Sequence, residues 1–297
     1  MNLYQWLDDD ALNLLREYFD KISEEIAERI SRQQNVREDT LSDDFVDIIN
    51  KSFGNLLPGL HFSISAKSNT SGVDEKKTGI DLGIILSSVF GHSYLNKAIF
   101  IQSKKSVYNS GRLHYPEIER KEGREMKGCK QAKSMLAISP SSFFFLFNSS
   151  EIIQSTHYNS LLKKHFNNTR RNSYYSQVAD PPFDELFKSF PYFPLSPLSD
   201  SIIKREIWAK KGKSYIGILV SSAHAIATFS NSSVCLEDVL PFSITLSDFM
   251  LYYFLTCFVG DSRLSILRKA GWEEDDKKHS TITRKTIFMK FYFDRKQ

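Results

Sequence analysis

Two short apolar segments with alternating side chains constrain the fold of this chain most. In TGIDLGIIL, aliphatic residues recur at every second position from 80 to 86, and Asp81 interrupts them. In KAIFIQSKK, residues 97–105, the apolar pattern ends in a glutamine and two lysines. Because successive side chains of a strand point to opposite faces, this two-residue period predicts β-strands. The side chains of 80, 82, 84 and 86 are expected on one face and Asp81 on the other.

The segments around these strands predict a mixed sheet with helices packed on it. Apolar residues spaced by three and four predict an amphipathic helix at about 10–31, and a second, short helix is expected at about 43–53. Alternation predicts a further strand at 60–66, followed by a charged helix at about 118–137 and an apolar strand at 142–148. The order helix–strand–strand–strand–helix–strand is typical of an α/β fold.

The second half of the chain carries a weaker pattern. A helix is expected at 151–166, and five prolines within 181–197 indicate a long connection or an extended arm. Further elements are expected at Ser214–Val220 (strand), 247–259 (helix) and Thr286–Phe293 (strand). We divide the chain into a core, 1–150, and a C-terminal α+β extension, 151–297. The extension either covers the same sheet as one continuous domain or forms an appendage.

Composition excludes several classes of protein. The 297 residues are 41% hydrophobic and 25% charged, which is ordinary for a globular protein and excludes a disordered chain. The longest apolar run, roughly 249–260, is too short to cross a bilayer, which takes about 20 residues. The three cysteines stand far apart without a CxxC pair, which argues against a disulfide framework and a structural zinc site. With an acidic N-terminus that lacks signal-peptide features, we expect a cytoplasmic protein without a membrane partner.

Charge is distributed unevenly along the chain. Residues 1–50 hold 13 acidic and 5 basic side chains, whereas residues 101–133 hold 9 basic and 4 acidic side chains. The basic stretch is compatible with binding to a phosphate backbone. A solvated helix face explains the same charges equally well.

The end of the 97–105 segment carries the residues most suited to chemistry. Gln102 and Lys104 lie two positions apart and share one strand face, where burying them is costly without a purpose. If this strand pairs with the one after Asp81, the three residues come together. Asp81, Gln102 and the Ser103 carbonyl could ligate Mg²⁺ or Mn²⁺, and Lys104 could orient or deprotonate the attacking water. Alternatively, Asp81 is a turn residue and the other two form the polar face of an edge strand.

These residues resemble a known family. TGIDLGIIL, followed about twenty residues later by AIFIQSKK, is similar to the PD-(D/E)XK nuclease superfamily in its Q-x-K variant. The resemblance extends through GCKQAKSMLAISPSSFFFLFN, which is similar to the helix and next strand of Mrr-like nuclease domains in anti-phage effectors of the CBASS and Lamassu type. It covers roughly residues 10–150 and implies a restriction-endonuclease-like core. In that family the matching Asp and Lys bind metal and activate water, which carries over to Asp81 and Lys104.

The resemblance also implies roles for other positions. Gln102 stands where the family more commonly has Glu, so one negative charge is lost and metal affinity without DNA should be weak. Many members place a Glu on the first helix, and Glu25, at the edge of the buried stripe, is the candidate here. Apart from the resemblance, the residues expected to face DNA, or simply solvent, are Lys105, Lys127, Lys130, Gln131 and Lys133.

The function expected from these features is a Mg²⁺-dependent endonuclease that cuts double-stranded DNA, acting as the effector of an anti-phage defence complex. The chain contains no P-loop, so control by ATP would require a regulatory partner such as an SMC-like ATPase. Assembly into a homo-oligomer is a further expectation. Two alternatives stay open: a catalytically inert nucleic-acid-binding or scaffold subunit with the same fold, and an RNase with the same core.

Overall fold

The computed structural model describes residues 9–52, 60–68, 78–90, 93–109, 111–150, 217–229, 233–255, 259–272 and 281–293. The helix expected at 151–166 and the proline-rich segment 181–197 lie outside these residues. Within the described part of the chain, no helix combines the length and apolar character that crossing a membrane requires.

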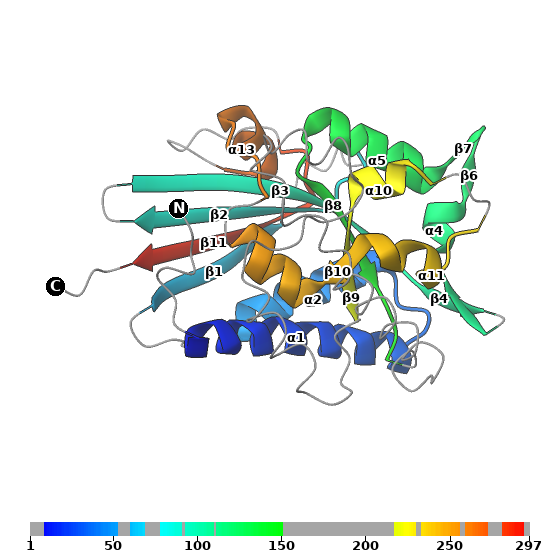
Figure 1. Ribbon diagram of the computed structural model, residues 1–297, viewed down its shortest axis with the longest axis horizontal. Coiled ribbons are helices and arrows are strands. Elements are labelled where there is room, and N and C mark those ends of the chain that lie inside the picture. Colours follow the sequence, from blue (N-terminus) through cyan, green and yellow to red (C-terminus); the bar gives the residue numbers. More distant parts are fainter. Residues whose placement is uncertain are drawn as a thin grey trace, which may run out of the picture.

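A seven-stranded mixed sheet organises the described residues (Figure 1). Its strands, in spatial order, are β1 (Leu60–Ser68), β11 (Lys285–Phe293), β2 (Leu82–Phe90), β3 (Ser93–Lys105), β8 (Ser142–Phe147), β9 (Ile218–Ser222) and β10 (Ser243–Thr245). Only β11–β2 and β3–β8 are parallel pairs within this sheet, and the others are antiparallel. Strands from before and after residue 150 therefore form one sheet, and β11 lies between β1 and β2.

Helices cover both faces of this sheet (Figure 1). On one face lie α1 (Asp9–Arg32), α2 (Glu38–Ser52), α12 (Leu246–Asp248) and a π-helical turn (Phe249–Phe254). The other face packs against α5 (Lys127–Ile138), α10 (Ala223–Ala227), α11 (Leu236–Val239) and α13 (Leu264–Ala270). Smaller elements complete the described chain: α4 (Pro116–Glu119), a 3₁₀ turn (Leu240–Phe242), and the hairpins β4 (Val107–Asn109) with β5 (Arg112–His114) and β6 (Lys121–Glu122) with β7 (Glu125–Met126).

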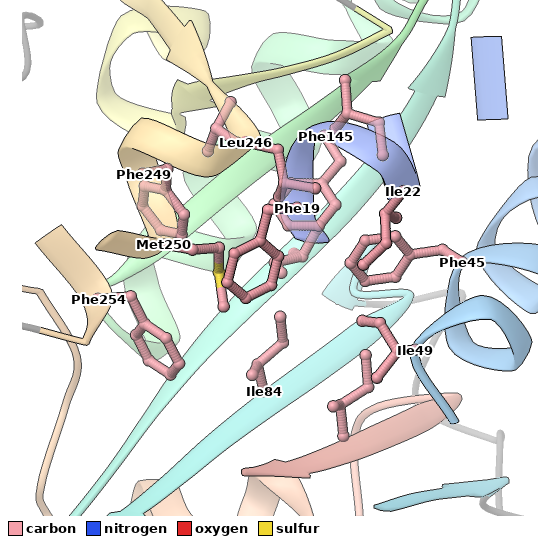
Figure 2. Close-up of a cluster of buried hydrophobic side chains, with 14 of the residues drawn as sticks. Phe19, Ile22, Phe45, Ile49, Ile84, Phe145, Leu246, Phe249, Met250 and Phe254 are labelled. Atoms are coloured by element: carbon pink, nitrogen blue, oxygen red, sulfur yellow. The ribbon is translucent and has the colours of Figure 1, made fainter. Parts of the chain in front are cut away.

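The α1/α2 face is packed with large rings (Figure 2). Phe45 of α2 meets Phe145 of β8 edge-to-face, with ring centroids 5.5 Å apart. Phe143 of the same strand packs against Phe249, at 4.8 Å. Because β8 is buried on both faces, its sequence SFFFLF is apolar throughout and does not alternate. The Phe45–Phe145 contact holds α2 against β8, which pairs with β3, the strand that carries Lys104.

Several sequence expectations hold and others need correction. The first helix, the strand at 60–66, the strand at 142–148 and the last strand are confirmed within a few residues. The second helix begins at Glu38, not at 43, because Glu38 and Asp39 favour the positive end of the helix dipole. The expected helix at 118–137 begins only at Lys127, since Gly123 adopts a positive φ of 74° in a tight turn before it.

The strand after Asp81 also differs from the expectation. β2 begins at Leu82, so Ile80 does not share a face with Leu82: it packs in the α5-side cluster, whereas Leu82 packs in the α1-side cluster. Gly79, at a positive φ of 68°, turns the chain just before this point. In the C-terminal half, the strand expected at Ser214–Val220 overlaps β9 from residue 218, and the helix expected at 247–259 corresponds to α12 followed directly by the π-helical turn. Residues 214–216 and 256–258 of these two predictions lie outside the described residues.

Candidate active site

Asp81 is fixed at the start of β2 by strands on both sides. Its backbone N–H donates to the Ile101 carbonyl at 2.9 Å, and its carbonyl accepts from the Lys285 N–H at 3.1 Å. The half-buried carboxylate points to β3, where Oδ2 accepts from Gln102 Nε2 at 2.7 Å and from the Ser103 N–H at 2.8 Å. The antiparallel pairing of β2 with β3 thus brings Asp81 against Gln102.

Gln102 is 4% exposed, and its side-chain amide is satisfied at one end only. Nε2 donates to Asp81 and, at 3.2 Å, to the Ser103 carbonyl. Oε1 is buried without a hydrogen-bond partner, and so are Oε1 of Gln131 and Oγ1 of Thr78. Buried polar atoms without a partner are rare in native proteins and call for an explanation such as a bound ion or water.

Lys104 is 1% exposed and lies two residues beyond Gln102, on the same face of the strand. Its Nζ forms an ion pair at 3.4 Å with Oε2 of Glu38, the first residue of α2. The other carboxylate oxygen of Glu38 accepts from the Lys105 N–H at 3.0 Å. One acidic side chain therefore holds both the buried lysine and the backbone that follows it.

A second acidic side chain feels the charge of Lys104. Although burial acts to raise it, the pKa of Glu117 is held below its ordinary value by the hydrogen bond and charge of Lys127 and, more weakly, by the charge of Lys104. The Lys104 ammonium group therefore interacts electrostatically with two carboxylates, Glu38 of α2 and Glu117 of α4. Both helices lie outside the strand pair that carries Asp81 and Gln102.

The helix carboxylate that pairs with Lys104 is Glu38 on α2, whereas the sequence candidate Glu25 lies on α1. Glu25 lies on α1, is 43% exposed, and pairs with Lys21 at 3.8 Å. Its charge acts on Tyr18, whose pKa burial raises and Glu25 raises further. The signal for Glu38 was an acidic pair directly before the apolar positions 41, 45, 46 and 49, which is typical of a helix start.

The basic residues expected to face DNA are largely engaged within the chain. Lys105 Nζ donates to the carbonyls of Gln34 at 2.7 Å and Val36 at 2.8 Å. Burial lowers the pKa of Lys105, although Glu38 acts in the opposite direction. The three lysines of α5 each pair with a glutamate from α4 or the β6–β7 hairpin: Lys127 with Glu117 at 2.5 Å, Lys130 with Glu122 at 3.5 Å, and Lys133 with Glu125. The basic stretch is therefore partly neutralised by its own surroundings.

The oxygen donors around Asp81 suit a hard cation in kind. Asp81 Oδ2 and the Ser103 carbonyl both lie within hydrogen-bond distance of Gln102 Nε2, so the amide nitrogen stands between them. Gln102 could join these oxygens as a ligand only by presenting Oε1 instead. Across the described ranges, no three His, Cys, Asp or Glu side chains gather as a metal-binding group.

Comparisons with known proteins identify no relative. No protein-family model, no curated protein and no solved structure matches the chain. The candidate site is accordingly defined by its geometry alone.

Proposed function

We propose that this protein is a Mg²⁺-dependent endonuclease that hydrolyses phosphodiester bonds of DNA at the site formed by Asp81, Gln102 and Lys104. The observation that carries the proposal is the burial of Lys104, which is 1% exposed and two residues from the Asp81–Gln102 contact. A buried ion pair seldom adds stability over an apolar pair of similar volume. The Lys104–Glu38 ion pair lies at the end of β3, beside the Asp81–Gln102 contact, and this placement supports a chemical role for Lys104.

The residues have distinct roles in this proposal. Asp81, the Ser103 carbonyl and Gln102 would hold the cation, which when bound supplies charge to the phosphate and acidifies a water molecule. Lys104 would hold the attacking water against the phosphate or take part in its deprotonation. Glu38, which contacts Lys104 at 3.4 Å, keeps the ammonium group in place and acts as a positioning residue. The resemblance to anti-phage effectors extends the proposal to a role in defence, under the control of a partner protein.

An inert nucleic-acid-binding or scaffold subunit is the second candidate. The hydrogen bond from Gln102 Nε2 to Asp81 favours it, because the amide nitrogen stands where a cation would be expected. The ion pairs of the three α5 lysines are equally consistent with a solvated helix. The two candidates differ in whether any strand scission depends on Asp81.

Plasmid nicking with and without Mg²⁺ separates the candidates. Asp81→Asn is the decisive variant, since it removes the charge and keeps an oxygen that can accept from Ser103. We expect wild-type nicking to require Mg²⁺ and the variant to lose it, while Asp47→Asn, a change at an exposed position of α2, keeps it. Equal nicking by wild type and Asp81→Asn would refute the proposal. Competition between labelled DNA and RNA then identifies the preferred nucleic acid.

A further inference from the structure

Two glutamines, Gln102 and Gln131, lie beside Gly79, and each carries a buried amide oxygen without a hydrogen-bond partner. A Cβ atom placed on Gly79 would lie 3.4 Å from Gln102 Oε1 and 3.0 Å from Gln131 Cγ. Oε1 of Gln102 and Oε1 of Gln131 are both buried and accept no hydrogen bond. Each unsatisfied oxygen costs free energy, and neither can donate to the other. Each oxygen therefore accepts from no donor, whereas the amide nitrogen at the opposite end of Gln102 is a donor.

The two ends of the Gln102 amide face different surroundings. Nε2 is directed to Asp81 Oδ2 and the Ser103 carbonyl, at 2.7 and 3.2 Å, and Oε1 is on the side of Gly79 and Gln131. The terminal torsion of glutamine is soft and roughly two-fold, so the amide can turn at small cost. After this turn, Nε2 would face the Gln131 side, and Oε1 would join Asp81 and the Ser103 carbonyl in an all-oxygen set. Such a set is repulsive by itself and attractive to a hard cation.

We propose that Gln131 is a positioning residue for the cation site: its Oε1 accepts a hydrogen bond from Gln102 Nε2 when the Gln102 amide turns its oxygen to the cation. This inference rests on the proposed function, because it takes Asp81 to be a ligand. It assigns the partly buried α5 glutamine to the metal site and not to DNA. It also accounts for a glutamine at 102, since the neutral amide becomes a good ligand when its other end is satisfied.

A glutamate at position 102 has no N–H to donate and needs no acceptor at 131. The dependence on Gln131 should therefore vanish in Gln102→Glu, which a double-mutant cycle measures directly. Mn²⁺ binding is followed by calorimetry on the full chain, at protein and metal concentrations high enough to detect the weak affinity expected without DNA, for wild type, Gln131→Leu, Gln102→Glu and the double variant. Gln33→Leu, at an exposed glutamine beyond α1, is the matched control.

We expect Gln131→Leu to weaken Mn²⁺ binding about tenfold, the effect of losing one well-placed buried hydrogen bond. In the Gln102→Glu background the same change should have almost no effect. Without metal, Gln131→Leu should melt no lower than wild type, because it removes an unsatisfied oxygen. A structural role for Gln131 would instead lower the metal-free melting temperature and act equally in both backgrounds.

The outcomes separate this inference from the proposed function. Mn²⁺ binding that is lost in Asp81→Asn but unchanged in Gln131→Leu would overturn the role of Gln131 alone. Equal weakening in the wild-type and Gln102→Glu backgrounds would overturn it as well. Failure of the wild type to bind Mn²⁺, or binding unaffected by Asp81→Asn, would overturn the proposed function and this inference with it.

Discussion

Glu38→Gln should destabilise the protein strongly because it leaves a buried cation without its counter-charge. Lys104 and Glu38 side chains are 2% and 22% exposed, and their charged atoms lie 3.4 Å apart. At an effective dielectric constant of about 20, the Coulomb attraction at this distance is roughly 5 kcal/mol. Removing one partner of a buried pair costs about 3–5 kcal/mol. Because water reaches part of Glu38, we expect a loss of about 3 kcal/mol.

Glu38→Gln tests the effect of the charge alone, because the glutamine oxygen can still accept the hydrogen bond that the Lys105 N–H donates to Glu38 at 3.0 Å. Asp39→Asn is the matched control on the same helical turn. Asp39 pairs with Arg284 at 2.8 Å, but both side chains are more than 30% exposed, so its loss should stay below about 1 kcal/mol. The free energy of unfolding is measured by urea titration at neutral pH for both variants.

A second variant tests the cause of the effect. Adding Lys104→Met to Glu38→Gln removes the unpaired charge and fills the same space, so most of the lost stability should return. Nicking activity should fall in Glu38→Gln and stay absent in the double variant. The reasoning is refuted if Glu38→Gln loses no more stability than Asp39→Asn, or if the double variant is less stable than the single one.

Three further changes test the site and its surroundings. Lys104→Arg should abolish turnover and spare Mn²⁺ binding, because arginine keeps the charge but has a larger planar head and does not release a proton; nicking at the wild-type rate would reduce Lys104 to a positive charge. Replacing Lys127 and Lys130 by glutamine should weaken DNA binding at all sequences and reduce the salt slope by about 2, and an unchanged slope would place this face of α5 away from DNA. Burial acts to raise the pKa of Asp261, but hydrogen bonds from Arg263 and Ser139 hold this pKa below its ordinary value of 3.8. The ionised carboxylate therefore stabilises the fold above pH 3.8. This stabilisation is lost as the pH falls through the folded-state pKa. Asp261→Asn should therefore melt below wild type at neutral pH, and the difference in melting temperature should shrink below about pH 4; a constant difference would contradict the assignment.

Local periodicity predicted two strands of the candidate site: β3, which carries Gln102 and Lys104, and β2, which begins directly after Asp81. A two-residue apolar period and its interruption by polar residues indicated both strands, and antiparallel pairing then places Asp81 opposite Gln102. These are short-range properties of the chain, because the alternation of side chains follows from strand geometry whatever the neighbours are. Lys104 is buried at the end of its strand, and the role inferred from the cost of that burial stays a prediction.

Tertiary structure decided which helix supplies the acidic partner and what surrounds the amide. Glu25 and Glu38 both lie on amphipathic helices, and only packing shows that α2, held by Phe45 against Phe145, brings Glu38 to Lys104. The insertion of β11 between β1 and β2 joins residues more than 200 positions apart. Such long-range pairings leave no local period in the sequence. The approach of the Gln102 and Gln131 side chains beside Gly79 depends likewise on where α5 packs on the sheet, which no pattern within either segment encodes.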